Sequence, residues 1–136
     1  MAGITVKFEH GRITHTAEAP IVGGQVVHPG AGPRSAVPAT ADSEKVLGVA
    51  LTDAAPKAAP TPGVLYVGTD QVTVASAPAV VPIKSNNSAN VGDLVVAHTS
   101  GAVKKAPEAA KITQIVGRVI EKITGADNIV LVRLGG

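Results

Sequence analysis

The feature that most constrains this chain is its shortage of large apolar side chains. Only two of its 136 residues are aromatic, Phe8 and Tyr66, and the 45% of residues that are hydrophobic are mostly alanine and valine. A large apolar side chain contributes roughly 1.5–3 kcal/mol when buried, so a core of alanine and valine is thin. The length fits one small domain. We expect part of its apolar surface to be buried against other subunits.

The distribution of apolar residues favours strands. β-branched side chains recur in pairs along the chain, and such side chains are stiff about χ1 and pack well on a pleated face. Short apolar runs bounded by turn residues predict strands at 21–28, 46–51, 64–67, 71–75, 79–83, 92–98 and 129–134. We expect a loop at 31–41 and an exposed, proline-rich loop at 54–63, where three prolines deny the chain ladder donors.

Segment 112–123 fits two structures. Its apolar residues recur at helical spacing, whereas Gly117 and the β-branched excess favour a strand. An internal comparison favours the strand, because a Gly-x-x-Val segment starting at Gly24 is followed 24 residues later by Gly48. A similar segment starting at Gly92 is followed 25 residues later by Gly117. We therefore predict two related halves, with a short helix at 107–111.

These patterns together predict an all-β fold, a small barrel or sandwich with two similar halves and an extended N-terminal arm. Residues 1–20 are expected to form the arm or an edge strand, since Ile4, Val6 and Phe8 alternate with polar residues before the break at Pro20. Residues 21–136 are expected to form a single β domain.

The chain lacks residues that several functional classes require. A net charge of +2, no basic run longer than Lys104-Lys105, and the scarcity of aromatic rings argue against nucleic-acid binding. The chain has no cysteine, so disulfides and thiolate chemistry are excluded. No 18 apolar residues run together and the start lacks an apolar signal-peptide core, so we expect a soluble protein that is neither membrane-bound nor secreted.

No catalytic or cofactor site is expected either. The four histidines, at 10, 15, 28 and 98, lack the spacing of a zinc site, and we expect them at the surface or in turns. The ten acidic residues are scattered singly, without a partner nucleophile or base at a recognisable spacing. We therefore predict a protein without enzymatic activity, metal or cofactor.

The order of four segments resembles a known family, the capsid decoration or head fibre proteins of tailed phages, long catalogued as a domain of unknown function. The segments are 11–27, which ends in Gly23-Gly24-Gln25-Val26-Val27; 47–55, which begins Leu47-Gly48-Val49; 91–105, which begins Val91-Gly92-Asp93-Leu94-Val95; and 115–134, which begins Ile115-Val116-Gly117. They cover nearly the whole chain. The chain departs from the family pattern by a longer loop at 31–45 and by the proline-rich stretch.

The resemblance implies a structural virion protein, made in the host cytoplasm, that binds the outer surface of the capsid and stabilises the assembled shell. Its implied partners are the major capsid protein and further copies of itself, as a trimer. We expect the arm to add as a strand to a sheet edge of the shell protein, with Ile4, Val6 and Phe8 as capsid contacts. The alternative is a virion-borne module that binds carbohydrate or a host surface, for which Phe8 and Tyr66 are the only ring candidates.

Overall fold

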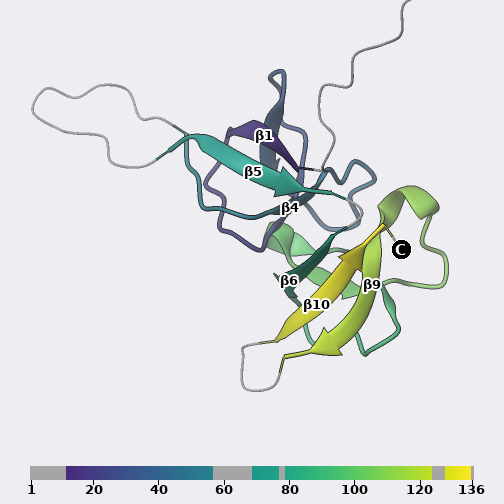
Figure 1. The fold of residues 1–136 in the computed structure, drawn as a ribbon. Helices are drawn as coiled ribbons and strands as arrows, with labels where there is room; N and C mark the ends of the chain where they lie inside the picture. The colour runs from purple at the N-terminus through teal and green to yellow at the C-terminus, as the bar shows by residue number, and fades with distance from the viewer. Residues whose placement is uncertain (1–11, 57–68, 77–78, 124–127, 136) are drawn as a thin grey trace, which may run out of the picture.

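The computed structural model describes residues 12–56, 69–76, 79–123 and 128–135, which form two lobes (Figure 1). The first lobe is a closed barrel of β1 (Arg12–Ala17), β2 (Val26–His28), β3 (Ser35–Pro38), β4 (Gly48–Ala50) and β5 (Gln71–Ala75). The second lobe is a sheet of β6 (Val80–Lys84), β7 (Leu94–Ala97), β8 (Val103–Lys105), β9 (Ile115–Lys122) and β10 (Ile129–Leu134). Two 3₁₀ turns, η1 (Thr99–Gly101) and η2 (Ile112–Gln114), belong to the second lobe. The predicted all-β class is confirmed.

The two lobes have the same topology. The strand order β1-β3-β2-β4-β5 closes through the β1–β5 pairing, and the second lobe has the order β6-β10-β9-β7-β8. Its edge strands meet at a parallel bridge between Ser85 and Val103, where the first lobe has the parallel pairing of β1 and β3. Strands β1 to β5 of the first lobe therefore correspond, in chain order, to strands β6 to β10 of the second.

The pairing register repeats as well. Val27 of β2 pairs with Gly48 of β4. At the same place in the second lobe, Val95 of β7 pairs with Gly117 of β9. These are the residues whose spacing in the sequence predicted two similar halves, and that prediction is confirmed.

The shared glycine has a steric cause. A Cβ atom at Gly48 would overlap the carbonyl oxygen of Ala75 on β5. In the second lobe, a Cβ atom at Gly117 would overlap the carbonyl oxygen of Arg133 on β10. Each lobe thus needs a residue without a side chain where β4 faces β5 and where β9 faces β10.

The apolar interior is aliphatic throughout the described residues. One buried cluster lies inside the first barrel. The other fills the second lobe and continues into the first through Val26, Ala39, Val49 and Ala75. The largest fully buried side chain is Ile83, and the next largest are valines. The expected thin core is therefore shared between the lobes.

Three segments differ from their predicted structure. The predicted loop at 31–41 contains β3, whose strand pattern is obscured by Pro33 and by Pro38 at its end. The predicted helix at 107–111 is wrong, because the chain forms a turn with a 3.0 Å hydrogen bond from Ala110 N to Pro107 O. For 112–123 the strand prediction is confirmed from Ile115 onward, and η2 occupies the first three residues.

The predicted arm and loop lie partly outside the described residues. β1 pairs with β3 on one side and β5 on the other, so residues 12–17 belong to the barrel. Of the residues predicted as an arm, 1–11 lie outside the described ranges, and the division into arm and domain stays a prediction. In the proline-rich segment, Ala54 is buried and bridges to Ile21; residues 57–68, which include the predicted strand 64–67, also lie outside.

The loop between β2 and β3 is fixed by one carboxylate. Glu18 accepts hydrogen bonds from the backbone N–H groups of Ala31 at 2.7 Å and Gly32 at 2.8 Å. The bonds from Gly32 and Ala31 lower the pKa of Glu18, because both favour the charged form. This clamp holds the chain as it enters β3.

The clamp predicts a pH-dependent stability. Because the pKa of Glu18 is lower in the folded state than in the unfolded chain, its stabilisation is complete above the ordinary glutamate pKa and disappears as pH falls through the lowered value. Urea unfolding of wild type and Glu18→Gln across acidic pH should therefore show a stability difference that shrinks as pH falls. A difference independent of pH would show that the charge of Glu18 does not hold the loop.

Candidate binding surface at the lobe junction

Hydrogen bonds to backbone carbonyl groups connect the two lobes. Gln25 Nε2 donates to the Ser100 carbonyl at 3.0 Å, and Gly101 N donates to the Ala39 carbonyl at 3.1 Å. Gly101 has a φ of +73°, and a Cβ atom there would lie 2.7 Å from Gln25 Cβ. η1 therefore fits closely against the start of β2.

Ion pairs at the junction are peripheral. Lys104 Nζ lies 3.1 Å from an Asp42 carboxylate oxygen, and Lys111 Nζ lies 3.0 Å from Glu44. The four side chains are a quarter or more exposed. Solvent-exposed pairs contribute about 0–1 kcal/mol each, so the close packing of η1 and the shared aliphatic cluster hold the lobes together.

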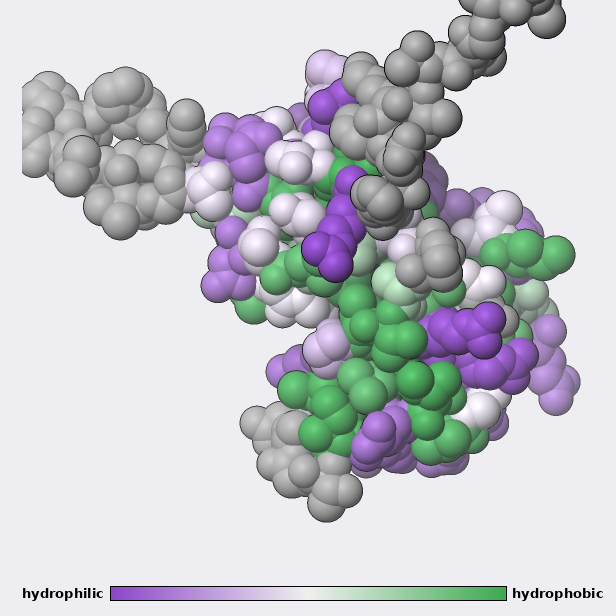
Figure 2. Space-filling view, viewed as in Figure 1, coloured by the Kyte–Doolittle hydropathy of each residue, from purple (hydrophilic) through white to green (hydrophobic). Residues whose placement is uncertain are grey.

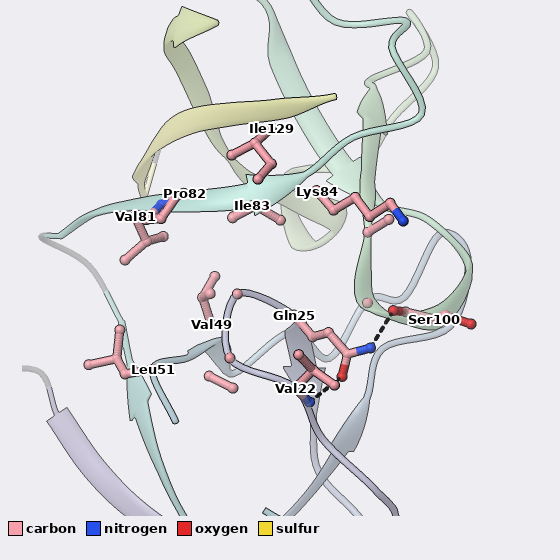
Figure 3. Close-up of a pocket in the computed structure, with 15 residues that line it drawn as sticks. Val22, Gln25, Val49, Leu51, Val81, Pro82, Ile83, Lys84, Ser100 and Ile129 are labelled. Carbon is pink, nitrogen blue, oxygen red and sulfur yellow. Dashed lines mark hydrogen bonds between the residues drawn. The ribbon is translucent and has the colours of Figure 1, made fainter. Parts of the chain in front are cut away.

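An apolar groove of about 700 Å³ lies between the lobes (Figure 3). The 22–25 turn and Leu51 line it from the first lobe, and residues 81–84 of β6 line it from the second. In Figure 3, Val49 lies between the 22–25 turn and β6, while Gln25 turns toward Ser100. Lys84 is the single charged residue in the lining.

The edge of β6 forms one wall of the groove. Pro82 pairs with Leu131 of β10, and its carbonyl oxygen would lie 3.3 Å from a Cβ atom at Gly24. Proline lacks a backbone N–H and is therefore suited to a sheet edge. The 22–25 turn of the first lobe thus packs against this edge.

The groove lacks the groups of a catalytic site. Its lining contains neither a carboxylate nor a histidine. Within the described residues, no three histidine or acidic side chains come close enough to hold a metal ion. General acid–base or nucleophilic chemistry requires such groups to converge, so the groove is suited to contact with apolar surface.

The described histidines occupy separate structural positions. His15 is buried within β1, so the surface or turn position predicted for it is wrong; its Nδ1 lies 3.1 Å from the Ile13 carbonyl oxygen. His28, at the end of β2, has a 3.0 Å hydrogen bond between Nδ1 and Ser43 Oγ, and burial lowers its pKa, with a further contribution from Lys45. His98 follows β7 directly, and its Nδ1 is buried without a hydrogen-bond partner. His10 lies outside the described residues.

Within the described part of the chain, large apolar side chains are exposed in three places around the lobes, one of which is Ile112 in η2. Val22, Leu51 and Val80 lie in or next to the groove, with 58%, 40% and 51% of their surface exposed. Val91 and Ile120, on the second lobe, are 62% and 44% exposed. Figure 2 shows apolar side chains extending from the barrel over the second lobe. The predicted contact residues Ile4, Val6 and Phe8 lie outside the described residues, so their role stays a prediction.

Sequence reasoning missed the groove. Its residues come from segments that are far apart in the chain, around positions 22, 51, 82, 100 and 129. A local signal was present in Pro82, which interrupts the apolar run of its strand and marks it as an edge.

A closed β-barrel joined to a five-stranded sheet of the same topology, with an aliphatic interior, exposed apolar surface and, among the described residues, no converging reactive groups, is typical of a structural protein that acts through contacts. The family model of the phage structural cement protein, described by gp24 of E217 and gp6 of Pam3, matches residues 3–135. The chain therefore belongs to the phage structural cement proteins. The resemblance noted in its sequence is confirmed, and with it a structural role on the capsid exterior that stabilises the shell.

A solved structure supports the same architecture. The N base of the head fibre protein gp8.5 of bacteriophage phi29 is similar with a TM-score of 0.62, covering 91% of this chain and 92% of that chain. At 14% identity this likeness shows the fold alone. Comparison with curated proteins finds no match. In the described part of the chain, none of the helices is long and apolar enough to cross a membrane.

Proposed function

We propose that this protein cements the capsid as a trimer that occupies a repeated site on the major capsid protein. The observation that carries the proposal is the family match over residues 3–135. A ligand that binds only the assembled shell stabilises it by mass action, and modest contacts add up over many equivalent sites. The thin aliphatic core fits this role, because the chain has apolar surface to bury against neighbours.

The proposed role involves no catalysis. The apolar groove between the lobes has a single titratable side chain in its lining, Lys84. A sugar-binding role has little support, since the chain has only two aromatic residues, Phe8 and Tyr66, and sugars are usually bound on exposed rings.

The N-terminal segment is proposed as an additional capsid contact. Ile4, Val6 and Phe8 alternate with Thr5, Lys7 and Glu9, the pattern of a strand with one apolar face. β1 is paired on both sides, so residues 12–17 are already used within the barrel. Residues 1–11 would then add to an open sheet edge of the shell protein, with the three apolar side chains facing it.

Deleting residues 2–11 tests this proposal. Purified wild type and the shortened protein would be added to undecorated capsids and, separately, to unassembled capsid protein. We expect wild type to bind assembled capsids selectively, and the shortened protein to fold normally but occupy fewer sites. Replacing Ile4, Val6 and Phe8 together by serine should reproduce the loss. Undiminished occupancy would refute the role of the segment, and failure of wild type to bind would refute the proposed function.

A further inference from the structure

The junction between the lobes uses a turn that occurs twice in the chain. In the first lobe, Gly24 N donates to the Ala50 carbonyl at 2.7 Å, and Val22 N donates to Gln25 Oε1 at 2.9 Å. In the second lobe, Gly92 N donates to the Val119 carbonyl at 2.8 Å, and Asn90 N donates to Asp93 Oδ2 at 2.8 Å. The turns 22–25 and 90–93 are therefore structurally equivalent.

One of these turns is covered and the other is open. The Gly24 turn packs against the edge of β6, where the Pro82 carbonyl lies 3.3 Å from the position of a Cβ atom. Among the described residues, no heavy atom lies within 4 Å of the equivalent position at Gly92. The second lobe therefore presents, uncovered, the same surface that the first lobe uses to contact its neighbour.

The open surface carries exposed apolar side chains. Val91 lies in the turn and is 62% exposed, and Ile120 follows Val119, to which the turn is hydrogen-bonded. Leu51 has the equivalent place beside the covered turn, directly after Ala50, and it lines the groove between the lobes. Burying Val91 and Ile120 against another surface would be favourable.

We infer that this surface binds the first lobe of a second copy, which repeats between chains the contact that joins the two lobes within one chain. The receiving strand would be β1, the equivalent of β6. Thr14 of β1 pairs with Thr73 as Pro82 pairs with Leu131. Thr14 is exposed, and the pairing of β1 with β3 begins only at Thr16.

Charge complementarity supports a second copy as the partner. Within the chain, Gln25 meets Gly101. The residue equivalent to Gln25 on the open surface is Asp93. The residue equivalent to Gly101 in the first lobe is Arg34, because both precede the start of equivalent strands and both have a left-handed backbone, with φ of +73° and +47°. The repeated contact would therefore place Asp93 of one copy beside Arg34 of the next.

The inferred contact is heterologous, joining the second lobe of one copy to the first lobe of another. Contacts of this type form closed rings when the rotation between copies closes. A cyclic trimer is one such ring and would contain six lobes. The inference does not depend on capsid binding, because it concerns contacts between copies of this chain alone.

Light scattering on the purified full chain tests the inference. Wild type should form an oligomer, and Val91→Glu should shift it to the 13.5 kDa monomer. Ile112→Glu is the matched control, because Ile112 is 92% exposed but belongs to η2, where Gln114 Nε2 donates to the Asp42 carbonyl of the same chain. That variant should keep the wild-type mass. A monomeric wild type, or an oligomer in Val91→Glu, would overturn the inference.

Cysteine pairs test the orientation, since the natural chain contains no cysteine. A mixture of Thr14→Cys and Val91→Cys proteins should form a disulfide-linked heterodimer, whereas Thr14→Cys mixed with Ile112→Cys should not. Cross-linking of Val91→Cys chiefly to itself would indicate a symmetric face-to-face contact and refute the arrangement. An unchanged oligomer with loss of capsid binding in Val91→Glu would assign the surface to the shell protein and refute it as well.

Discussion

Replacing Gly117 by alanine should lower the free energy of unfolding by about 3 kcal/mol, in the upper range for an overpacked interior. The new Cβ atom would overlap the Arg133 carbonyl, a backbone group that cannot move without disturbing the pairing of β9 with β10. For a chain of this length, the loss corresponds to a fall of about 10 °C in Tm. Thermal and urea unfolding followed by circular dichroism would measure it.

The doubled fold supplies a matched variant. Gly48→Ala should be similarly destabilising, because the Ala75 carbonyl occupies the equivalent place in the first lobe. Glu121→Ala, at an exposed position of β9, should change the stability little. If Gly117→Ala unfolded like wild type, the close approach of β9 and β10 would be wrong.

Replacing Gly101 by alanine should destabilise the protein by about 2–4 kcal/mol through the lobe junction. The left-handed backbone at φ +73° disfavours any side chain, by roughly 1–2 kcal/mol. The added Cβ would also lie 2.7 Å from Gln25 Cβ and 2.9 Å from the Val26 carbonyl oxygen, so the lobes would have to separate. Thermal unfolding of dilute protein would measure the combined effect.

Gly92→Ala separates the two contributions. Gly92 also has a positive φ, of +92°, but no heavy atom of the described residues lies within 4 Å of the added Cβ. In protein diluted enough to be monomeric, this variant should lose only the backbone contribution, about 1–2 kcal/mol. Equal losses at the two glycines would mean that Gly101 does not pack against the first lobe.

Much of the fold was predictable from local patterns. The strand 71–75 and the last strand, 129–134, have the predicted bounds. Both are rich in β-branched residues and are bounded by clear turn signals. The spacing of Gly24, Gly48, Gly92 and Gly117 predicted the doubling, since each glycine fills the same structural role in its lobe.

The segments that were mispredicted have weak or conflicting local signals. β3 lies between prolines that normally mark a loop, and β8 consists of one valine and two lysines. Both are held by pairing with distant strands, which no local pattern reports. At 107–111, the proline and alanines favour a helix, but the chain has to return to the start of β9 within a few residues.

The candidate surfaces were not predictable in the same way. The groove lies between a turn of one lobe and an edge strand of the other. The open turn at Gly92 can be recognised as a candidate surface only by comparing it with the covered turn at Gly24. The overall role was reached through the family resemblance, because the residues alone offered no catalytic motif and named no partner.

Heating capsids with and without this protein bound is the most direct test of the central claim, that the chain stabilises a shell by contacts it makes only on the assembled form. Undecorated capsids from phage lacking the protein would be mixed with increasing amounts of it, and genome release would be followed with a DNA dye during heating. The release temperature should rise with the number of sites filled and level off once they are saturated. Filled sites with an unchanged release temperature would contradict the account.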